Sequence, residues 1–564
     1  MLKVSRPAHS RSSRAGAGVS LFGAAANGIH RWRCAKLWVR VQLDAFRLDP
    51  FGYLQAVAWR ARGLRVRSRN RIAALAGRSP AAYSFWISCR EPRLMRFDRA
   101  RRGLLANTLA VIDCRRGTNG IEATLASLPD EIRPILLRGS YRDVARIDAI
   151  GDLGKFFATD ELWICPLNVG DRLAPSAASA YAEAIAAHPE QKVIYADDDL
   201  LDGRAYRLEP HFKPDWNPEL FQHHDFVTGA AMLRVGSEEL ASVADEGWPE
   251  GLVQRVVDRS PTPLHLPFIL HHRRTRPEPV LPTNEMPPLA VHPRVSVIIP
   301  TRNRADLLRT CLEGLTRTDY RDLEIIVVDN DSDDPESLAY LNQLRTRGIT
   351  VLRIEGEFNY SALNNAAVEA ARGEFLCFLN NDIEIVEPSW LQWLVGHAAR
   401  PDIGAAGARL LYSDGTLQHA GVYIGIGGGA AHAHRFLKAD ERGYFDRSRL
   451  PQRVSAVTGA CLVVSRDKFV AVGGFDEKNF RVAFNDIDLC IKLNERGWQS
   501  FYEPRATLIH HESKSRGSDK DKANRGRFAD ELSALKRIWR TDERRDPFHH
   551  PQLSPFCEQF VISI

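Results

Sequence analysis

The sequence predicts an α/β protein with two similar domains in tandem, each built on a mostly parallel sheet. Apolar strands alternate with helical segments from about residue 295 to 400, and polar residues cluster where those strands end. The segments at 374–401 and 455–465 are repeated in weaker form at 161–189 and 225–235. At 564 residues the chain is also several times longer than one usual domain, so we expect more than one core.

A proline-rich stretch separates the two copies, because TRPEPVLPTNEMPPLAVHPR interrupts any helix or inner strand. The first copy resembles the second in the order of its strands and loops, and both end on a pair of histidines. The sequence therefore divides into a basic arm with helical segments (1–104), a first copy (105–274), a linker (275–294), a second copy (295–520) and a C-terminal helix and tail (521–564).

The first hundred residues are strongly basic, with 20 Lys and Arg against 4 Asp and Glu, although the whole chain carries only +6. Such an arm favours contact with anionic lipid headgroups or another polyanion, and a basic, partly disordered surface is the plainer interpretation. No zinc-finger spacing, RNP sequence or basic-zipper repeat supports nucleic acid as the partner. No apolar run approaches the ~18 residues of a spanning helix. We therefore expect a cytoplasmic protein, peripheral at the inner face of the membrane.

The nine cysteines are scattered and form no C-x-x-C pair. That pattern is typical of reduced, mostly buried thiols in a cytosolic protein. Glycine-rich GIGGGAAH does not have the spacing of a dinucleotide fingerprint, and neither a phosphate-binding P-loop nor a G-x-S-x-G elbow occurs. Kinase, dehydrogenase and hydrolase functions lose their main support.

Polar residues follow two buried strands of the second copy. The runs VSVIIP (295–300) and LEIIVVDN (323–330) predict strands, and Asp329 and Asp331 end the second of them. The triplet Asn380–Asp382 ends another. Carboxylates at the mouth of a parallel sheet can hold a hard cation and bind a nucleoside, so these residues suit a nucleotide diphosphate with its metal. Each acid alone could instead be a turn or helix-capping residue.

Asp486 begins a predicted helix, DIDLCIKLNERG, which Gly497 ends. There it could act as a general base toward a hydroxyl, or simply cap the helix. His510 ends a later strand and could complete a metal shell, or be satisfied by ordinary hydrogen bonds. The first copy offers only Glu250 near the place of Asp486, which indicates a degenerate catalyst.

The second copy resembles family 2 of the inverting nucleotide-sugar glycosyltransferases, which have the GT-A fold. The match rests on VSVIIPTRNR, LEIIVVDNDSDD, FLCFLNNDIEIVEP, AVTGACLVVS, FNDIDLCIKL and LIHHESKSRG, in this order across about 294–520. It is most similar to bacterial O-antigen and rhamnan-type polysaccharide enzymes. The resemblance implies two GT-A-like domains in tandem, the first degenerate, after a basic and mostly helical arm.

The resemblance also implies a role for individual residues. Asp486 corresponds to the family's catalytic base, and Asp382, with His510, to its site for magnesium or manganese. Asn380 stands where the family has its first metal-binding acid, which puts coordination from that position in doubt. The nucleotide is expected to contact Pro300, Thr301, Asn303, Asp329, Asp331 and Asn381, and the acceptor to contact Thr458, Gly459, Ala460 and Asp488.

The expected activity is transfer of a sugar, with inversion, from a nucleotide-diphosphate donor to a hydroxyl of a saccharide or polyprenyl-linked saccharide acceptor. Two alternatives stay open. The chain could be a carbohydrate-binding scaffold that keeps the fold without turnover, or a bifunctional synthase in which Glu250 serves a second active site.

Overall fold

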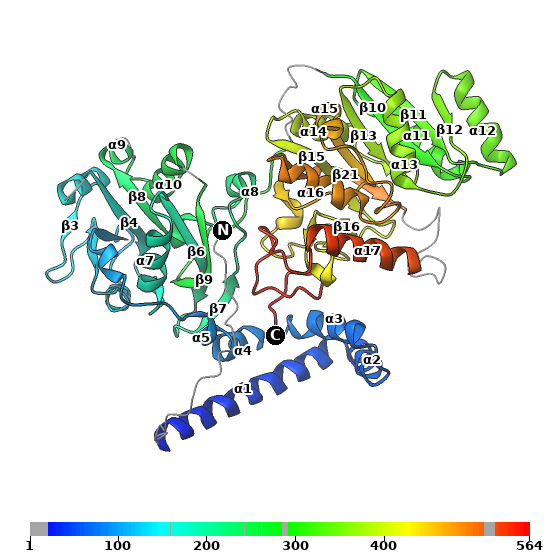
Figure 1. Ribbon diagram of the computed structural model, residues 1–564. Helices are drawn as coiled ribbons and strands as arrows, with labels where there is room; N and C mark the ends of the chain where they lie inside the picture. The colour runs from blue at the N-terminus through cyan, green and yellow to red at the C-terminus, as the bar shows by residue number, and fades with distance from the viewer. Residues whose placement is uncertain (1–20, 158–159, 242, 261, 285–291, 512–524) are drawn as a thin grey trace.

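The computed structural model describes residues 21–157, 160–241, 243–260, 262–284, 292–511 and 525–564. It contains two large sheets with the same strand order, visible as separate halves in Figure 1. The first sheet runs β3-β2-β1-β4-β8-β6-β9-β5, with β7 beside β6. The second runs β12-β11-β10-β13-β20-β15-β21-β14, with β16 beside β15. The repeat seen in the sequence is therefore also a repeat of topology.

The first sheet and its helices occupy residues 108–273. Its strands are β1 (Thr108–Asp113), β2 (Ile132–Leu137), β3 (Arg146–Ile147), β4 (Glu161–Asn168), β5 (Arg172–Leu173), β6 (Val193–Leu201), β7 (Arg207–His211), β8 (Ala231–Gly236) and β9 (Leu264–Arg273). Its helices are α6 (Ile121–Leu125), α7 (Ala177–Ala187), α8 (Pro218–His223), α9 (Ser237–Leu240) and α10 (Trp248–Arg259).

The second sheet and its helices occupy residues 295–510. Its strands are β10 (Val295–Thr301), β11 (Leu323–Asp329), β12 (Thr350–Arg353), β13 (Phe375–Leu379), β14 (Ile383–Ile385), β15 (Ile403–Leu411), β16 (Leu417–His419), β19 (Gln452–Val454), β20 (Cys461–Ser465) and β21 (Gln499–His510). A small separate sheet pairs β17 (Val422–Ile424) with β18 (Ala430–His432). The helices are α11 (Ala305–Thr316), α12 (Pro335–Thr346), α13 (Tyr360–Ala370), α14 (Trp390–Ala398), α15 (Arg466–Ala471) and α16 (Asn485–Glu495).

The two strands expected at 295–300 and 323–330 form as β10 and β11, which pair in parallel. Every residue of β10 is buried, as its run of branched apolar side chains predicts. The sheet is mixed, however, because β20 runs antiparallel to both β13 and β15. The expectation of a mostly parallel sheet therefore holds for β10 to β13 and for the pair β15 and β21, while β14, β16, β19 and β20 pair antiparallel.

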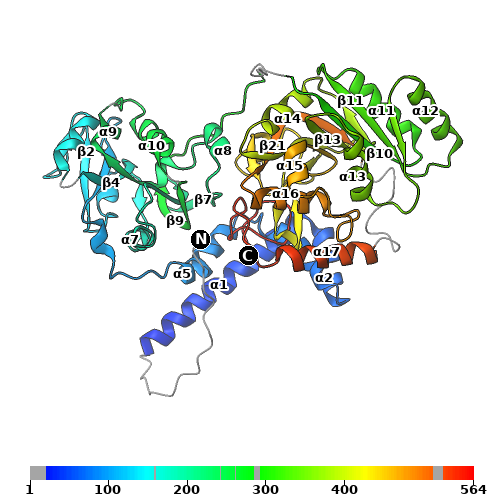
Figure 2. The same cartoon turned by 45° about the horizontal axis from the view of Figure 1, so that its top comes forward.

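The basic arm is helical from residue 21 onward; its first twenty residues lie outside the described part of the chain. It comprises α1 (Leu21–Leu48), α2 (Pro50–Ala61), α3 (Arg65–Ala76), α4 (Ala82–Cys89) and α5 (Glu91–Leu94). A small core of Val41, Ala45, Leu75 and Ala76 holds α1 against α3. In both views the arm lies along one edge of the molecule, beside the two sheets (Figures 1 and 2).

The cysteine expectation was wrong at two positions, because Cys34 and Cys89 form a disulfide. The packing of α1 on α4 brings together two residues that are 55 positions apart, and nothing in their spacing announces it. The other seven cysteines are buried free thiols, as expected.

The C-terminal part contains α17 (Arg525–Trp539) and a segment, residues 540–564, that contacts all the other parts. Gln552 accepts a hydrogen bond from Trp86 of the arm at 3.0 Å, and His550 lies 2.8 Å from Asp197 of the first copy. Asp546 accepts from Ser455 of the second copy at 2.6 Å. Among the helices described, none is both long and apolar enough to cross a membrane.

Candidate active site

The carboxyl ends of β10, β11 and β12 carry the predicted nucleotide-binding residues. Thr301 and Asp329 are paired in register at the last position of β10 and β11. Arg353, the last residue of β12, bridges the two acids: its Nη1 lies 3.1 Å from Asp329 Oδ2 and its Nη2 lies 2.6 Å from Asp331 Oδ1. Sequence reasoning missed Arg353, although the end of the next strand was the place to look.

The loops after β10 and β11 are joined by the amide side chain of Asn303. Its oxygen accepts hydrogen bonds from the backbone of Asp333 and Asp334, each at 3.1 Å, and its Nδ2 donates to Asp333 Oδ1 at 2.9 Å. The backbone N–H of Asn303 donates to Ser332 Oγ at 2.8 Å. Asn303 has φ +55°, a left-handed conformation that asparagine tolerates. Pro300 lies inside β10, one residue before the end, and pairs with β11 after the pairing with β13 has stopped. Its missing N–H therefore leaves no gap toward β13.

The NND triplet after β13 contacts both neighbouring loops. Asn381 donates from Nδ2 to Thr301 Oγ1 at 2.9 Å, which ties the triplet to the end of β10. Asn380 donates its backbone N–H to the carbonyl of Ala460 at 3.0 Å, which ties it to the VTGA segment before β20. The triplet thus stands between the predicted nucleotide site and the predicted acceptor site.

Asp382 and His510 are buried and adjacent, with Nε2 3.0 Å from Oδ1. The other ring nitrogen, Nδ1, lies 2.8 Å from Gln418 Oε1 on β16. With that amide oxygen as acceptor, Nδ1 carries a proton, so neutral His510 aims a lone pair at a carboxylate oxygen. The Nε2 lone pair and the carboxylate oxygen repel each other unless a proton or a cation lies between them. The donor set of one carboxylate and one oriented imidazole therefore fits a divalent metal, with Gln418 fixing the tautomer.

Asp486 lies in the first turn of α16, as its position in the sequence predicts. Oδ2 accepts from the backbone N–H of Gly459 at 2.8 Å, and Oδ1 accepts from the N–H of Ile487 at 2.9 Å. Tyr360 donates its hydroxyl to the carbonyl of the same Gly459 at 2.7 Å. Removal from water raises the pKa of the Asp486 carboxyl, and the backbone hydrogen bonds only partly offset that effect.

Asp488 does not join the predicted acceptor site. It is buried, with Oδ2 2.9 Å from Lys492 Nζ and Oδ1 accepting from the indole N–H of Trp539 at 2.9 Å. A half-turn of helix separates its direction from that of Asp486, so it holds α17 against α16 instead. Thr458, Gly459 and Ala460, by contrast, lie between Asp486 and the NND triplet.

A family model matches this region. Residues 296–470 match the model of glycosyl transferase family 2. These residues form a family 2 glycosyltransferase domain. The match spans β10 to α15, including the ends of β10, β11 and β13 and the VTGA segment, and it stops before α16.

Similar proteins extend beyond the family 2 domain. A Sinorhizobium fredii protein named y4gI is 38% identical over 71% of this chain and 49% of its own length. The O-antigen biosynthesis protein RfbC of Myxococcus xanthus is 35% identical over 68% of this chain and 33% of its own length. An N-acetylglucosaminyl-diphospho-decaprenol L-rhamnosyltransferase of Mycobacterium tuberculosis is 28% identical over 40% of this chain and 78% of its own length. The chain thus spans half or less of the first two relatives.

The first copy keeps an aspartate at the place of Asp382, because Asp171 lies directly before β5 as Asp382 lies directly before β14. On its central strand it carries a different set of acids. Asp197, Asp198 and Asp199 are fully buried on β6, the strand that takes the place of β15. Asp198 lies 2.7 Å from Nζ of buried Lys213 and 2.5 Å from Arg276, so its charge is neutralised inside the protein. Glu250, the acid proposed for a second site, is exposed on α10.

Asp197, His265 and His550 converge closely enough to suggest a metal site. Their hydrogen bonds indicate an ion pair from His265 and a neutral hydrogen bond from His550 instead. His265 has Nε2 2.9 Å from Asp197 and Nδ1 3.0 Å from Asp215, so both nitrogens carry protons and the two carboxylates raise the pKa of the ring against its burial. His550 accepts from the Gln552 N–H at Nδ1, which leaves the proton on the Nε2 that faces Asp197.

Proposed function

We propose that the chain is an inverting, metal-dependent glycosyltransferase that builds a bacterial surface polysaccharide of the O-antigen kind. The donor is a nucleotide-diphosphate sugar, and the acceptor is a hydroxyl of a lipid-linked saccharide at the cytoplasmic face of the membrane. The names of the similar proteins from Myxococcus xanthus and Mycobacterium tuberculosis support the pathway and the lipid-linked acceptor.

One observation carries the proposal: a continuous set of hydrogen bonds joins the predicted donor site to the predicted base. Asn381 binds Thr301 at the nucleotide end, and Asn380 binds Ala460. Gly459, the residue before Ala460, binds Asp486. Three backbone segments that are distant in sequence therefore form one surface, at the strand ends where open α/β sheets bind ligands.

In the proposed reaction, Asp486 accepts the proton of the acceptor hydroxyl while that oxygen forms a bond to the anomeric carbon. The bond from this carbon to the diphosphate oxygen breaks on the opposite face, so one displacement inverts the configuration. Asp382 and His510 would hold magnesium or manganese, which neutralises charge on the leaving diphosphate. Asp329, Asp331 and Arg353 would orient the nucleoside.

The matching strand order of the two sheets supports tandem GT-A-like domains, with boundaries at 105–274 and 295–520. Part of the linker, residues 285–291, and the basic run at 514–516 lie outside the described residues. Because buried ion pairs fill the first copy, we assign it a supporting role, which leaves the family 2 domain as the single catalyst.

The decisive experiment measures nucleoside diphosphate released from UDP-, GDP- and dTDP-sugars with manganese or magnesium, with and without membrane extract as acceptor. Asp486→Asn should abolish metal-dependent release from the preferred donor. Asp467→Asn is the matched control, because Asp467 is an exposed aspartate in the first turn of α15 in the same domain. If the wild type turns over no donor even with the extract, the chain is a non-catalytic scaffold.

A further inference from the structure

The long helix of the arm turns an apolar stripe toward solvent. Trp32, Val39, Leu43 and Phe46 recur at spacings that place them on one face of α1, and they are 67%, 50%, 51% and 39% exposed. The opposite face holds Val41 and Ala45, which are fully buried in the arm's core. The helix is therefore apolar on two sides. The core of the arm covers the side with Val41 and Ala45, and the other side is open to solvent.

The next helix, which contacts α1 through the ring pair Phe46 and Tyr53, also exposes apolar side chains. Phe51, at the start of α2, is 87% exposed, and Leu54 and Val57 are 57% and 45% exposed. We call the exposed stripe of α1 together with these three residues of α2 the arm face; its members are Trp32, Val39, Leu43, Phe46, Phe51, Leu54 and Val57, while Trp38 and Leu48 are also exposed but lie on other sides of α1. An exposed apolar surface of this extent indicates a binding partner.

The charge around the arm face is almost entirely positive. Residues 21–76 contain eleven Lys and Arg but only two acids, Asp44 and Asp49. Both acids are engaged, since Asp44 accepts from Ser79 at 2.7 Å and Asp49 pairs with Arg71 at 2.6 Å. On α1, Arg33, Arg40 and Arg47 follow one flank of the stripe, and Lys36 lies over the ring of Trp32.

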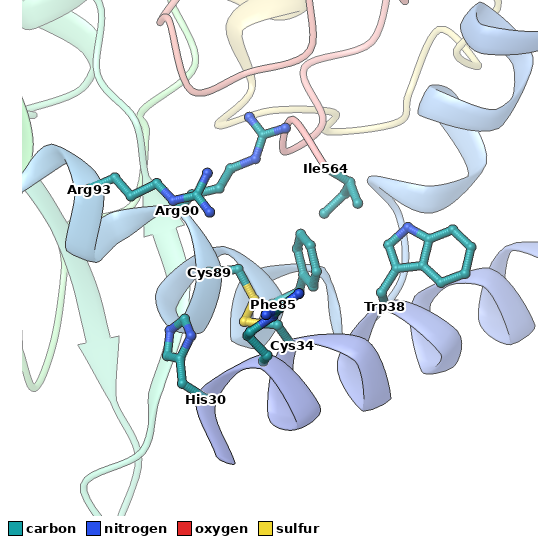
Figure 3. A pocket seen from close by; sticks show the side chains of 9 residues that line it. His30, Cys34, Trp38, Phe85, Cys89, Arg90, Arg93 and Ile564 are labelled. Carbon is teal, nitrogen blue, oxygen red and sulfur yellow. A yellow bond between two sulfur atoms is a disulfide. The ribbon is translucent and has the colours of Figure 1, made fainter. Parts of the chain in front are cut away.

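A cavity of about 430 Å³ opens beside α1 and has the same character. Figure 3 shows Trp38 and Phe85 as its aromatic side and Arg90 and Arg93 as its cationic side. Burial lowers the pKa of Arg90, and the neighbouring Arg93 adds to the effect. An anionic group with an apolar body would satisfy both sides.

We infer that the arm face docks on the surface of a membrane that contains anionic lipid, with α1 and α2 lying in the plane of the interface. Apolar side chains would enter the acyl boundary while the flanking arginines meet lipid phosphates, as in interfacial amphipathic helices. A second copy of the chain is a poorer occupant, because two strongly positive faces would repel each other. The docking stands without the chemistry above; only its benefit, proximity to a lipid-linked acceptor, rests on the proposed function.

Vesicle flotation of the full chain tests this inference. The protein should float with phosphatidylcholine vesicles that contain about 30% phosphatidylglycerol and remain behind with pure phosphatidylcholine. Raising NaCl from about 50 mM to about 500 mM should weaken binding at least ~10-fold, because salt screens the arginines. Equal binding to the two vesicle types, or none to either, overturns the inference.

Two sets of variants separate the apolar and the basic contribution. Leu43→Ser with Phe46→Ser should reduce vesicle binding ~10-fold or more, whereas Phe436→Ser with Val470→Ser, which are more exposed and lie on the second copy, should not. Arg33→Gln, Arg40→Gln and Arg47→Gln together should do the same. Their control combines substitutions to Gln at three exposed cations of the first copy: Arg142, Arg146 and Lys155.

Two further measurements, of turnover and of oligomeric state, separate membrane docking from the proposed function and from self-association. All variants concern exposed side chains, so release of nucleoside diphosphate from donor in solution should stay unchanged. If the wild type floats but turns over no donor, the docking holds and the proposed function fails. If light scattering shows a dimer that the arm variants convert to monomer, the arm face binds a second copy and the membrane inference is overturned.

Discussion

Gly459 donates its backbone N–H to Asp486 Oδ2 over 2.8 Å, while its own carbonyl accepts the Tyr360 hydroxyl at 2.7 Å. The position of the proposed base is therefore fixed by a backbone that α13 supports from the other side. Gly459 thus connects α13, the VTGA segment and α16, so both the pKa and the position of Asp486 depend on it.

The activity should decline on the acidic side with an apparent pKa above the ordinary aspartate value of 3.8, because burial raises the pKa of Asp486. The base works only when deprotonated, so kcat/KM falls as pH drops through this raised pKa. Asp486→Asn should lower kcat ~10²- to 10⁴-fold at neutral pH. A pH profile of wild type that stays flat down to the ordinary aspartate range would contradict the assignment.

Gly459→Ala should lower kcat about 10- to 100-fold while the KM for donor changes little. A Cβ there would lie 3.3 Å from Tyr360 Oη and 3.4 Å from Asp486 Cβ, so the Tyr360 hydroxyl must give by a few tenths of an ångström and its support of the Gly459 backbone weakens. Gly251→Ala is the control. It makes the same substitution at a glycine of α10 where an added Cβ meets nothing within 4 Å. Steady-state kinetics of both variants test this prediction. A raised KM with unchanged kcat in Gly459→Ala would argue against a role of Gly459 in positioning the base.

Arg353→Gln should raise the KM for donor roughly 10-fold, because it releases Asp331 and leaves buried Asp329 without its cation. A modest loss of stability should accompany it, since the guanidinium is partly exposed and screened. Arg345→Gln, at the exposed end of α12, provides the control. Equal donor binding by both variants, measured by calorimetry, would remove Arg353 from the nucleotide site.

His510→Ala should raise the metal concentration for half-maximal activity ~10- to 100-fold, and Gln418→Ala should have a smaller effect in the same direction. His511→Ala is the matched control, because the His511 ring contacts Glu384 and Ser413, and its backbone N–H, which donates to the Asp382 carbonyl at 3.0 Å, is kept in the variant. The free Mn²⁺ signal in paramagnetic resonance reports binding independently of turnover. Unchanged manganese affinity in His510→Ala would place the metal elsewhere.

His265→Gln should destabilise the protein by about 3 kcal/mol near pH 6, because two acids, one of them fully buried, lose their shared cation. Asp197 and Asp215 raise the pKa of His265, so its contribution is present below the unfolded value of about 6.5 and is lost as pH rises through the folded pKa. The stability gap between wild type and variant should therefore shrink as pH rises above the unfolded value of about 6.5 and through the raised folded pKa. Denaturant unfolding at a series of pH values, with His188→Gln as control, measures this gap.

Local patterns were enough to predict β10, β11 and α16, because each combines a clear apolar period with a clear end signal. The positions of Thr301 and Asp329 at paired strand ends followed from the same reasoning. Those features depend on neighbours in the chain, which a sequence displays directly.

Partners supplied by distant segments could not be predicted in this way. Arg353 and Gln418 reach the site from β12 and β16, and only the sheet order brings them there. The resemblance predicts that Asp488 contacts the acceptor, but its direction on the helix and its hydrogen bond from Trp539 of α17 decide its contacts. The Cys34 to Cys89 disulfide likewise depends on how α1 packs.

The contact between Asp197 and His550 has a consequence for the order of folding during synthesis. The first copy leaves the ribosome several hundred residues before His550 is made, with Asp197 buried on β6 and lacking one of its two histidines. Its packing is completed only when the last segment of the chain threads between the arm and both sheets. Maturation of this protein should therefore finish after translation, and truncation near residue 545 should trap an early, loosely packed form.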